Sequence, residues 1–319
     1  MVKLSIIILN VGGREYLGRL LNSISNSSFD DYEILIADTE EINVNWDKVI
    51  KIKLDHNYGP PRNRNITFEE AKGEYILFLD NDTEVFRDTL QNFITYMDEN
   101  PDKMVQLKLI NTKDLIDSAG GFIDDLGYPT ERGRDLKPLE YRRYDRILYG
   151  KGAALGMKRE TFKKLGGFDG DFFYGFADTD LGYRGWRKGI PVVFHPDSVV
   201  RHYEHGSFSS AEREERITFL LESRRLYFVF KNYDTGFLLR RIPFIIYYLI
   251  GSMLMDVLRR RKFNLFKIRV KAVSWFLTKI PEIIRKRLNQ SKEQYVYTDS
   301  ELVNLGLILY HKDVIKKLR

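Results

Sequence analysis

Short apolar runs alternate with amphipathic stretches through the first hundred residues of the chain. The apolar runs are SIIIL (5–9), YEILIAD (32–38), VIKIKL (49–54) and YILFLD (75–80). Between and after them, apolar side chains recur at helical spacing in residues 15–25, 60–72 and 89–99. Prolines open the second of these helices and Gly73 follows it, as expected at the two ends of a helix. Strands that alternate with helices predict an α/β fold with a mostly parallel sheet.

The pattern is less regular after residue 100. Residues 103–150 mix short strand-like pieces with turn signals. Further on, helices are predicted over residues 157–165, 179–188 and 212–227, and a short strand over PVVFHP (191–196). We therefore expect one α/β domain over residues 1–230 and a separate helical region over residues 231–319.

The C-terminal region is apolar and basic at once. Residues 242–255 (IPFIIYYLIGSMLM) form an apolar run of 14 residues, which is short for a membrane-spanning helix of about 20. Behind it, Phe266, Val270, Val273, Leu277 and Ile280 lie on one helical stripe among Lys and Arg side chains. This pattern is typical of helices that lie on an anionic membrane. Packing against the rest of the chain, or an oligomer contact, is the alternative.

Charge is unevenly distributed over the 319 residues. Residues 240–290 contain 13 Lys and Arg against Asp256 and Glu282, a net charge of +11. Because the whole chain carries +6, the remainder carries −5. No recognition motif for nucleic acid accompanies the basic region, so a membrane surface is the favoured partner. The absence of cysteine excludes disulfides and thiolate metal sites.

Two carboxylates follow the fourth predicted strand directly. Asp80 and Asp82 are two residues apart, so in extended chain their side chains point the same way. Ligands of open α/β sheets bind beyond the carboxyl ends of the strands. Paired carboxylates there suit Mg²⁺ or Mn²⁺, which in turn holds a substrate diphosphate. An ordinary Asp-Asn-Asp turn is the alternative interpretation.

Other polar residues are expected at the same edge of the sheet. Asp38 also follows an apolar strand. Asn57, Arg62 and Asn65 lie in the passage from a loop into a helix, where a helix N-terminus and a cation help to hold a nucleotide diphosphate. Taken singly, each could equally be a cap, a turn residue or a surface charge.

A second acidic group, Asp178 with Asp180, follows a loop rich in glycine and aromatic residues. Asp178 is placed to cap a helix or to act as a general base at its start. Phe172, Phe173 and Tyr174 could wall a sugar ring and raise the pKa of the base. Downstream, His202 and His205 flank a loop that can supply one metal ligand.

With these motifs in order, the sequence resembles glycosyltransferase family 2, in particular its rhamnosyltransferase-like branch, over roughly residues 3–230. The resemblance rests on SIIILNVGGREYLGRLLNSI, on EILIADTE, on HNYGPPRNRNITFEEAKGEYILFLDNDTEV, and on the block from GKGAALGMKRE to VVRHYEHGS. It implies a GT-A fold, which is Rossmann-like, with a mostly parallel sheet flanked by helices.

The resemblance also implies roles for individual residues. Asp38 would contact the nucleobase or ribose, and Asp80-Asn81-Asp82 stands where the family has its DXD motif. Asp82 would be the main metal ligand, with His202 near the metal and His205 as the fallback. Asp178 matches the general base of an inverting transfer.

Two positions depart from the family pattern. Ala177 stands where a Glu usually precedes the base, so Asp180 could share the base's role. The Asn common near the end of the first strand is replaced around Gly12-Gly13. Neither change removes the metal ligands or the base, so an active enzyme is expected.

The function expected from the sequence is a metal-dependent inverting glycosyltransferase. Its cofactors would be Mn²⁺ or Mg²⁺ and a UDP-, dTDP- or GDP-sugar, and its acceptor a glycan or lipid-linked hydroxyl. It would be a cytoplasmic protein on the inner face of the cell membrane, because the first apolar run is too short for a signal peptide; an oligomer is possible. Alternatives are a nucleotidyltransferase that uses Gly12-Gly13-Arg14, a non-catalytic scaffold and a glycoside hydrolase with paired carboxylates.

Overall fold

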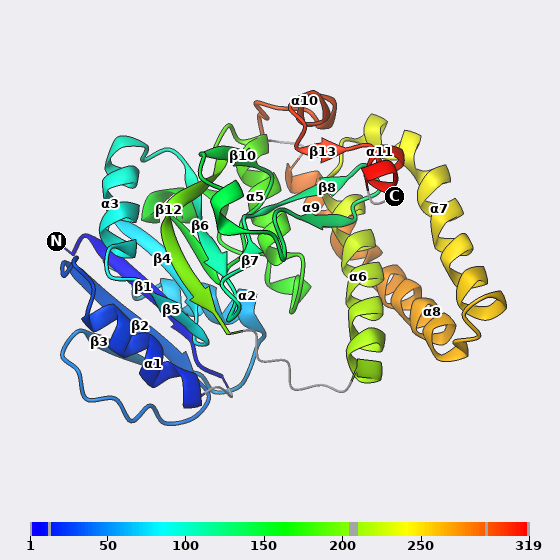
Figure 1. The fold of residues 1–319 in the computed structure, drawn as a ribbon. Coiled ribbons are helices and arrows are strands. Elements are labelled where there is room, and N and C mark those ends of the chain that lie inside the picture. Colours follow the sequence, from blue (N-terminus) through cyan, green and yellow to red (C-terminus); the bar gives the residue numbers. More distant parts are fainter. Residues whose placement is uncertain (1, 12–13, 204–209, 291–292, 318–319) are drawn as a thin grey trace. The chain divides into compact units, whose positions relative to one another are not determined.

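The computed structural model describes residues 2–11, 14–203, 210–290 and 293–317, which form two compact units (Figure 1). The first unit comprises Met1–Gly121, Glu131–Trp186 and Ile190–His205. The second comprises Phe122–Thr130, Arg187–Gly189 and Gly206–Arg319. From the sequence, a boundary between two domains is expected after residue 230. These compact units do not test that boundary, which stays a prediction.

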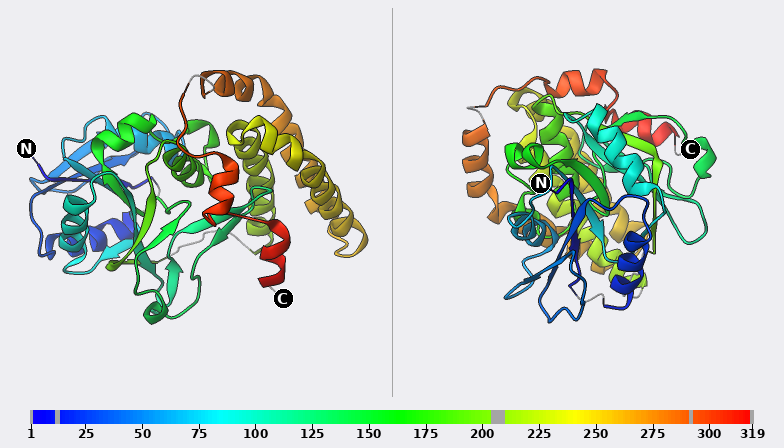
Figure 2. Two further views of the ribbon diagram at one scale, coloured as in Figure 1. Left: turned by 90° about the horizontal axis from the view of Figure 1, so that it is seen from above. Right: turned by 90° about the vertical axis from the view of Figure 1, so that its left-hand side faces the viewer.

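The first unit is built on one large twisted sheet (Figure 2). Its main strands run in the order β10-β12-β6-β11-β4-β1-β2-β3, while β5 pairs with β12 and β7 with β6. The pairs β3-β2, β2-β1 and β1-β4 are parallel, which confirms the predicted α/β class. The strands are β1 (Leu4–Leu9), β2 (Tyr32–Asp38), β3 (Val49–Lys53), β4 (Tyr75–Asp80), β5 (Thr83–Val85), β6 (Met104–Ile110), β7 (Ile116–Ser118), β10 (Asp145–Ile147), β11 (Ala154–Lys158) and β12 (Val192–His202).

Helices cover both faces of this sheet, which explains the continuous apolar run of β4. Leu77 and Leu79 belong to a buried cluster with side chains of α1 and α3, whereas Phe78 points to the opposite face. There its ring lies 5.1 Å from that of Phe162 in α4, which in turn lies 4.7 Å from Phe68 in α2. A strand covered on two sides needs apolar residues at every position. The helices are α1 (Arg14–Ser25), α2 (Pro60–Phe68), α3 (Thr89–Glu99), α4 (Arg159–Leu165) and α5 (Ala177–Arg187), with 3₁₀ turns at Pro138–Glu140 and Gly170–Phe172.

Several predicted helix bounds in this unit differ from the structure by a few residues; α5, expected over residues 179–188, spans Ala177–Arg187. The helix expected from residue 157 begins at Arg159, because Met157 and Lys158 pair with Ile76 and Tyr75 as the end of β11. Backbone pairing with β4 therefore overrides the local helical pattern. The helix that begins at Pro60 ends at Phe68, a turn earlier than expected. Helix α4 ends as predicted before Gly166, which adopts φ 73° in the left-handed region that favours glycine.

The second unit contains long helices and a small sheet. In α6, the ring of Phe230 lies 4.9 Å from Phe276 of α8, and the Arg224 guanidinium lies 3.8 Å from the Trp275 ring. The small sheet has the order β13-β8-β9. Its strands are β8 (Gly121–Asp124), β9 (Pro129–Glu131) and β13 (Ile308–Leu309), and the helices are α6 (Ser210–Asn232), α7 (Thr235–Leu258), α8 (Phe263–Thr278), α9 (Ile280–Gln290), α10 (Asp299–Asn304) and α11 (His311–Lys317).

The apolar run at residues 242–255 is part of a longer helix than its 14 residues indicated. Helix α7 has 24 residues, and among the described residues it alone is long and apolar enough to cross a membrane. Length and composition are the only grounds for that statement.

Candidate active site at the carboxyl edge of the sheet

Three neighbouring parallel strands bring polar residues together in the first unit. Strand β1 lies between β2 and β4, so Asn10, Asp38 and Asp80 follow at the same edge. Asn10 Nδ2 donates to Asp38 Oδ2 over 2.9 Å, and Asn81 Nδ2 donates to Asn10 Oδ1 over 3.0 Å. Asn10 and Asp38 are buried. The edge therefore carries one hydrogen-bonded network that runs from β2 to the end of β4.

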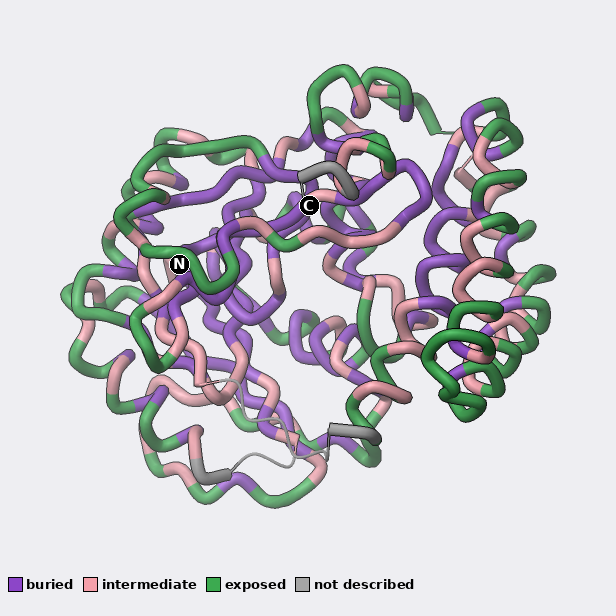
Figure 3. Tube along the Cα trace, turned by 45° about the vertical axis from the view of Figure 1, so that its right-hand side comes forward, coloured by how far each residue is buried: buried purple, intermediate pink, exposed green. Residues whose placement is uncertain are grey.

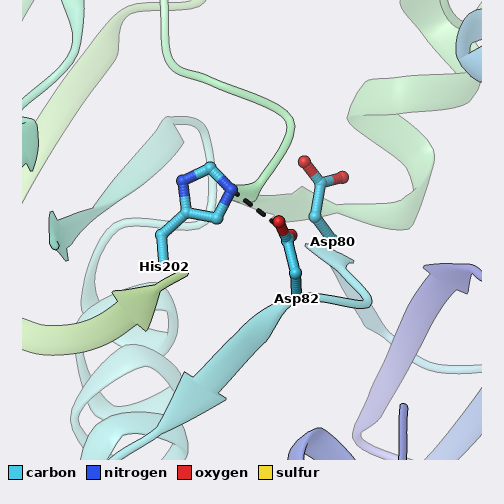
Figure 4. A group of neighbouring side chains, drawn as sticks. All are labelled: Asp80, Asp82 and His202. Carbon is cyan, nitrogen blue, oxygen red and sulfur yellow. Dashed lines mark ion pairs between the residues drawn. The ribbon is translucent and has the colours of Figure 1, made fainter. Parts of the chain in front are cut away.

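Beside this network, Asp80, Asp82 and His202 form a cluster of possible metal ligands (Figure 4). One ligand atom from each residue lies within 4.8 Å of the others, and His202 Nε2 is 3.3 Å from Asp82 Oδ1. The pairing of β5 with β12 brings them together, because His202 stands opposite Thr83, the residue after Asp82. The predicted association of these three side chains is thus present.

His202 is oriented by a residue that the sequence did not single out. Its Nδ1 lies 2.9 Å from Asp117 Oδ2, which leaves Nε2 directed toward Asp82. Asp117 is buried at an irregularity in the pairing of β7 with β6, where a strand can re-aim a side chain. Burial opposes the charged imidazole, but the hydrogen bonds that it donates to Asp117 and Asp82, with the charges of Asp80 and Asp82, raise the pKa of His202 to about 10.

The donor set fits a divalent cation of the kind predicted. Two carboxylates supply hard oxygen ligands, which suit Mg²⁺ and Mn²⁺, and an imidazole adds one nitrogen. The Asp117 carboxylate behind the imidazole is the usual support for a metal-binding histidine. A cation bound here would take the place of the proton on His202 Nε2.

Asp178 occupies the first turn of α5 and has the surroundings of a general base. Its Oδ2 accepts from the Gly152 N–H over 3.0 Å, and its side chain is 31% exposed. Burial raises the pKa of Asp178 above the ordinary 3.8, against the opposing effect of Arg64 and the Gly152 N–H. A carboxylate with a raised pKa that is still reachable from solvent can accept a proton from a bound hydroxyl.

Arg64 links Asp178 to the cluster of possible metal ligands. Its Nη2 lies 2.6 Å from Asp80 Oδ1, and its Nη1 lies 3.7 Å from Asp178 Oδ1. Only 8% of the Arg64 side chain is exposed. Gly152 permits this approach, because a Cβ there would lie 2.3 Å from Arg64 Nη1. One buried cation thus holds both carboxylates in place.

The predicted donor-binding residues, Asn57 on the loop before α2 and Arg62 and Asn65 within α2, have partners in the protein. Asn57 Oδ1 accepts from the Gly59 N–H and from Asn63 Nδ2. Arg62 lies 2.9 Å from Asp171. Asn65 donates to the carbonyl of Phe168 and accepts from its N–H. These contacts shape the loop, and the donor-binding roles of Asn57, Arg62 and Asn65 stay predictions.

The aromatic wall predicted beside Asp178 is only partly available. Phe172 is fully buried and therefore does not line a sugar site, whereas Phe173 and Tyr174 are exposed. Asp180 is buried and pairs with Arg184 over 2.7 Å within α5. Gly12, Gly13 and His205, on which other expectations rested, lie outside the described residues.

Sequence reasoning missed three residues of this site: Asn10, Arg64 and Asp117. Asn10 carried a readable signal, since it follows an apolar strand directly, as Asp38 and Asp80 do. Arg64 stands two residues from Arg62 in the predicted helix, and only the rotation of the helix about its axis decides which of the two arginines faces the site. Asp117 lies in the stretch without regular pattern and carried no signal.

A family model matches the part of the chain that carries most of these site residues. The family model described as "Glycosyl transferase family 2" matches residues 5–166, half of the chain. The chain belongs to this family. This confirms the family expected from the sequence and makes the protein a glycosyltransferase.

The matches to curated relatives of this glycosyltransferase cover only part of each relative. The "O-antigen biosynthesis protein RfbC" of Myxococcus xanthus is 27% identical over 223 residues, which cover 64% of this chain and 18% of that protein. The "GalNAc(5)-diNAcBac-PP-undecaprenol beta-1,3-glucosyltransferase" of Campylobacter jejuni is 33% identical over 110 residues, 31% of this chain and 36% of that protein. The chain thus spans well under half the length of either.

Solved structures confirm the GT-A fold. The structure of GalNAc-T7 with UDP, GalNAc and Mn²⁺ matches with a TM-score of 0.58 at 18% identity, over 89% of this chain and 57% of that chain. The mannosyltransferase PcManGT from Pyrobaculum calidifontis, in complex with GDP-Man and Mn²⁺, matches with a TM-score of 0.53 at 13% identity, over 87% and 88%.

Proposed function

We propose that this glycosyltransferase is metal-dependent and inverting, and that it moves a sugar from a nucleotide diphosphate to a hydroxyl of a glycan or lipid-linked acceptor. The observation that carries the proposal is one site in which the ligand atoms of Asp80, Asp82 and His202 lie within 4.8 Å. Arg64 connects this cluster to the half-buried carboxylate of Asp178. A set of ligands for one metal ion, joined to a general base, is the minimum that a metal-dependent transfer of this kind needs.

The proposed reaction is a single displacement. Asp178 takes the proton from the acceptor hydroxyl as its oxygen forms a bond to the anomeric carbon of the donor sugar. The bond from that carbon to the diphosphate oxygen breaks, and its electron pair leaves with the nucleoside diphosphate. One inversion at carbon follows. A divalent cation held by Asp82, Asp80 and His202 would stabilise the charge on the leaving diphosphate.

The donor is proposed by class only. Solved relatives of the same fold contain Mn²⁺ with UDP or with GDP-Man, so UDP-, dTDP- and GDP-sugars all stay candidates. Asp38, held by Asn10 at the end of β2, is the residue proposed for the nucleobase or ribose side. Asn81 joins that network to the metal ligands, so nucleotide and diphosphate would lie along one edge.

The acceptor and location are proposed from the basic region and from the relatives. The Campylobacter relative is named for an undecaprenol-linked acceptor. Residues 240–290 carry a net charge of +11, which would attract an anionic membrane. We therefore propose a peripheral protein on the cytoplasmic face of the cell membrane, with a lipid-linked or glycan acceptor.

Calorimetric titration of UDP, dTDP and GDP, each with and without Mn²⁺, tests the proposal. We expect one nucleotide to bind, and to bind at least tenfold more tightly with Mn²⁺, because the metal links the diphosphate to the carboxylates. The same titrations with Mg²⁺ rank the two metals. Absence of binding by all three nucleotides to the folded protein would favour the non-catalytic scaffold.

Removal of the carboxylate behind His202 tests the metal site by a different route. Asp117→Ala is expected to weaken Mn²⁺ binding by about 10- to 100-fold, because the imidazole loses the partner that orients it. Mn²⁺ affinity is measured by calorimetry in the presence of the nucleotide that binds. Asp114→Ala is the matched control, since Asp114 is 72% exposed and pairs with Arg201 instead. An unchanged Mn²⁺ affinity in Asp117→Ala would remove His202 from the ligand set.

A further inference from the structure

Each of the three long C-terminal helices after α6 exposes a row of apolar side chains. On α7 the exposed fractions of Ile250, Leu254 and Leu258 are 51%, 53% and 74%. The spacing of three, four or seven residues places each row on one side of its helix, and on α7 Phe244, Tyr247 and Met255 are exposed beside the row. The rows comprise Leu239, Ile246, Ile250, Leu254 and Leu258 on α7; Phe263, Phe266, Val270 and Leu277 on α8; and Ile280, Ile284 and Leu288 on α9.

The opposite side of α8 packs against the rest of the unit. The exposed row of α8 is therefore not the side that contributes to the hydrophobic core. Leu265, Ala272 and Phe276 are buried, and Phe276 meets Phe230 of α6. The stripe expected from the sequence, which includes Phe266 and Val270, is the side that α6 leaves uncovered. In Figure 3 the α7–α8 hairpin accordingly shows repeated exposed turns.

Buried ion pairs fasten α7 to α8 and α8 to α6. Asp256 of α7 is fully buried and accepts from Arg269 Nε of α8 over 2.7 Å. The same guanidinium bonds Glu222 of α6, which is buried and pairs with Arg225 over 2.6 Å. Moving α7 away from α8 would part Asp256 from Arg269 and leave it only Arg260, 3.3 Å away, and breaking a buried ion pair is costly.

The attachment decides between two ways in which α7 could meet a bilayer. Its 24 residues extend about 36 Å, enough to cross a hydrocarbon core. Crossing would require α7 to leave α8, and its two ends both carry cations, Arg240 and Arg259–Lys262, instead of one end only. An in-plane helix keeps the ion pair and places both cationic ends at the headgroups.

The charges on these helices indicate which partner contacts the exposed apolar rows. The two acids of residues 240–290 are used internally, Asp256 by Arg269 and Glu282 by Lys279 and Lys286. A second copy of the chain would bring one cationic face against another, whereas anionic lipid complements it. A pocket of about 540 Å³ beside α7 is lined by the apolar Ile250 and Leu254 and by Arg260, whose side chain is 53% exposed.

We infer that α7, α8 and α9 lie in the plane of an anionic lipid surface, with their apolar rows in the interface and α7 docked on α8 rather than crossing the bilayer. The inference rests on the membrane location in the proposed function and specifies its geometry. It assigns the exposed rows to acyl chains and the turn Arg259–Lys262 to lipid phosphates.

Vesicle binding tests the lipid surface. The protein is expected to sediment with vesicles of phosphatidylcholine and phosphatidylglycerol in about equal parts, and about tenfold less with phosphatidylcholine alone. Ile250→Glu should weaken binding by about tenfold, since it puts a charge in the row. Leu139→Glu, at an apolar residue of the first unit that is 64% exposed, is the control and should bind normally. Absence of binding, or an Ile250→Glu effect on self-association alone, would overturn the inference.

The cysteine-free chain allows the orientation of α7 to be measured directly. Single cysteines are introduced by Gly236→Cys, where a Cβ has no atom within 4 Å, and by Arg259→Cys at the other end. Each single-cysteine protein is then reconstituted into sealed vesicles of the same lipids. An impermeant thiol reagent should label the cysteine at position 236 and the cysteine at position 259 to the same extent. Protection of one end until detergent is added would show a crossing helix and overturn the inference. Metal-dependent nucleotide binding, measured on the same samples, reports separately on the proposed function.

Discussion

Replacement of Asp82 by alanine is expected to abolish metal-dependent nucleotide binding and to lower kcat/KM by about a thousandfold. Asp82 supplies one of two carboxylates in the cluster, and its Oδ1 lies 3.3 Å from His202 Nε2. Without it, Asp80 must hold the cation while one of its oxygens is engaged by Arg64. Loss of charge stabilisation on the leaving diphosphate is worth several kcal/mol, which corresponds to about three factors of ten in rate.

The measurement pairs calorimetry with initial rates of sugar transfer or donor hydrolysis over a range of Mn²⁺ concentrations. Asp88→Ala is the matched control, because Asp88 is an exposed carboxylate six residues away that makes no capping bond to α3. Asp88→Ala should retain normal binding and rate. If Asp82→Ala still binds nucleotide with undiminished dependence on Mn²⁺, the metal site proposed here is wrong.

Asp178→Asn is expected to leave nucleotide binding intact and to lower kcat by about 10²- to 10⁴-fold, the usual contribution of a general base. Asparagine keeps the size of the side chain and can still accept from the Gly152 N–H, but it cannot take a proton from the acceptor. Arg64 retains Asp80 as a partner, so the arrangement of the metal ligands should persist. The variant thus separates binding from transfer.

The pH dependence provides a further readout for Asp178. Because burial raises its pKa above 3.8, the carboxylate becomes protonated, and kcat falls, at a higher pH than for an ordinary Asp. That acid limb should disappear in Asp178→Asn. Asp180→Asn examines the alternative base, and Glu160→Gln, 59% exposed, is the neutral control. Near-normal turnover by Asp178→Asn together with a large loss in Asp180→Asn would transfer the role to Asp180.

Several features of this protein were determined by the sequence alone, because they depend on local patterns. Helix α3 has the bounds that its spacing predicts, and β4 is the buried strand that its apolar run indicates. Parallel strands end at a common edge, so the placement of Asp38 and Asp80 at one edge followed from the two predicted strands. The family, too, was readable from its motifs. Regular periods and strand ends are short-range properties, and a single sequence records them.

Only the tertiary structure decided the contacts that join distant segments. His202 meets Asp82 because β12 pairs with β5, and Asp117 reaches the imidazole from an irregular stretch 85 residues earlier. Arg64 rather than Arg62 contacts Asp80, since residues two apart on a helix point to different sides. Likewise, the ion pair of the buried Asp256 with Arg269 joins α7 to α8. Such contacts depend on strand register and helix rotation, which long-range packing sets and no local pattern specifies.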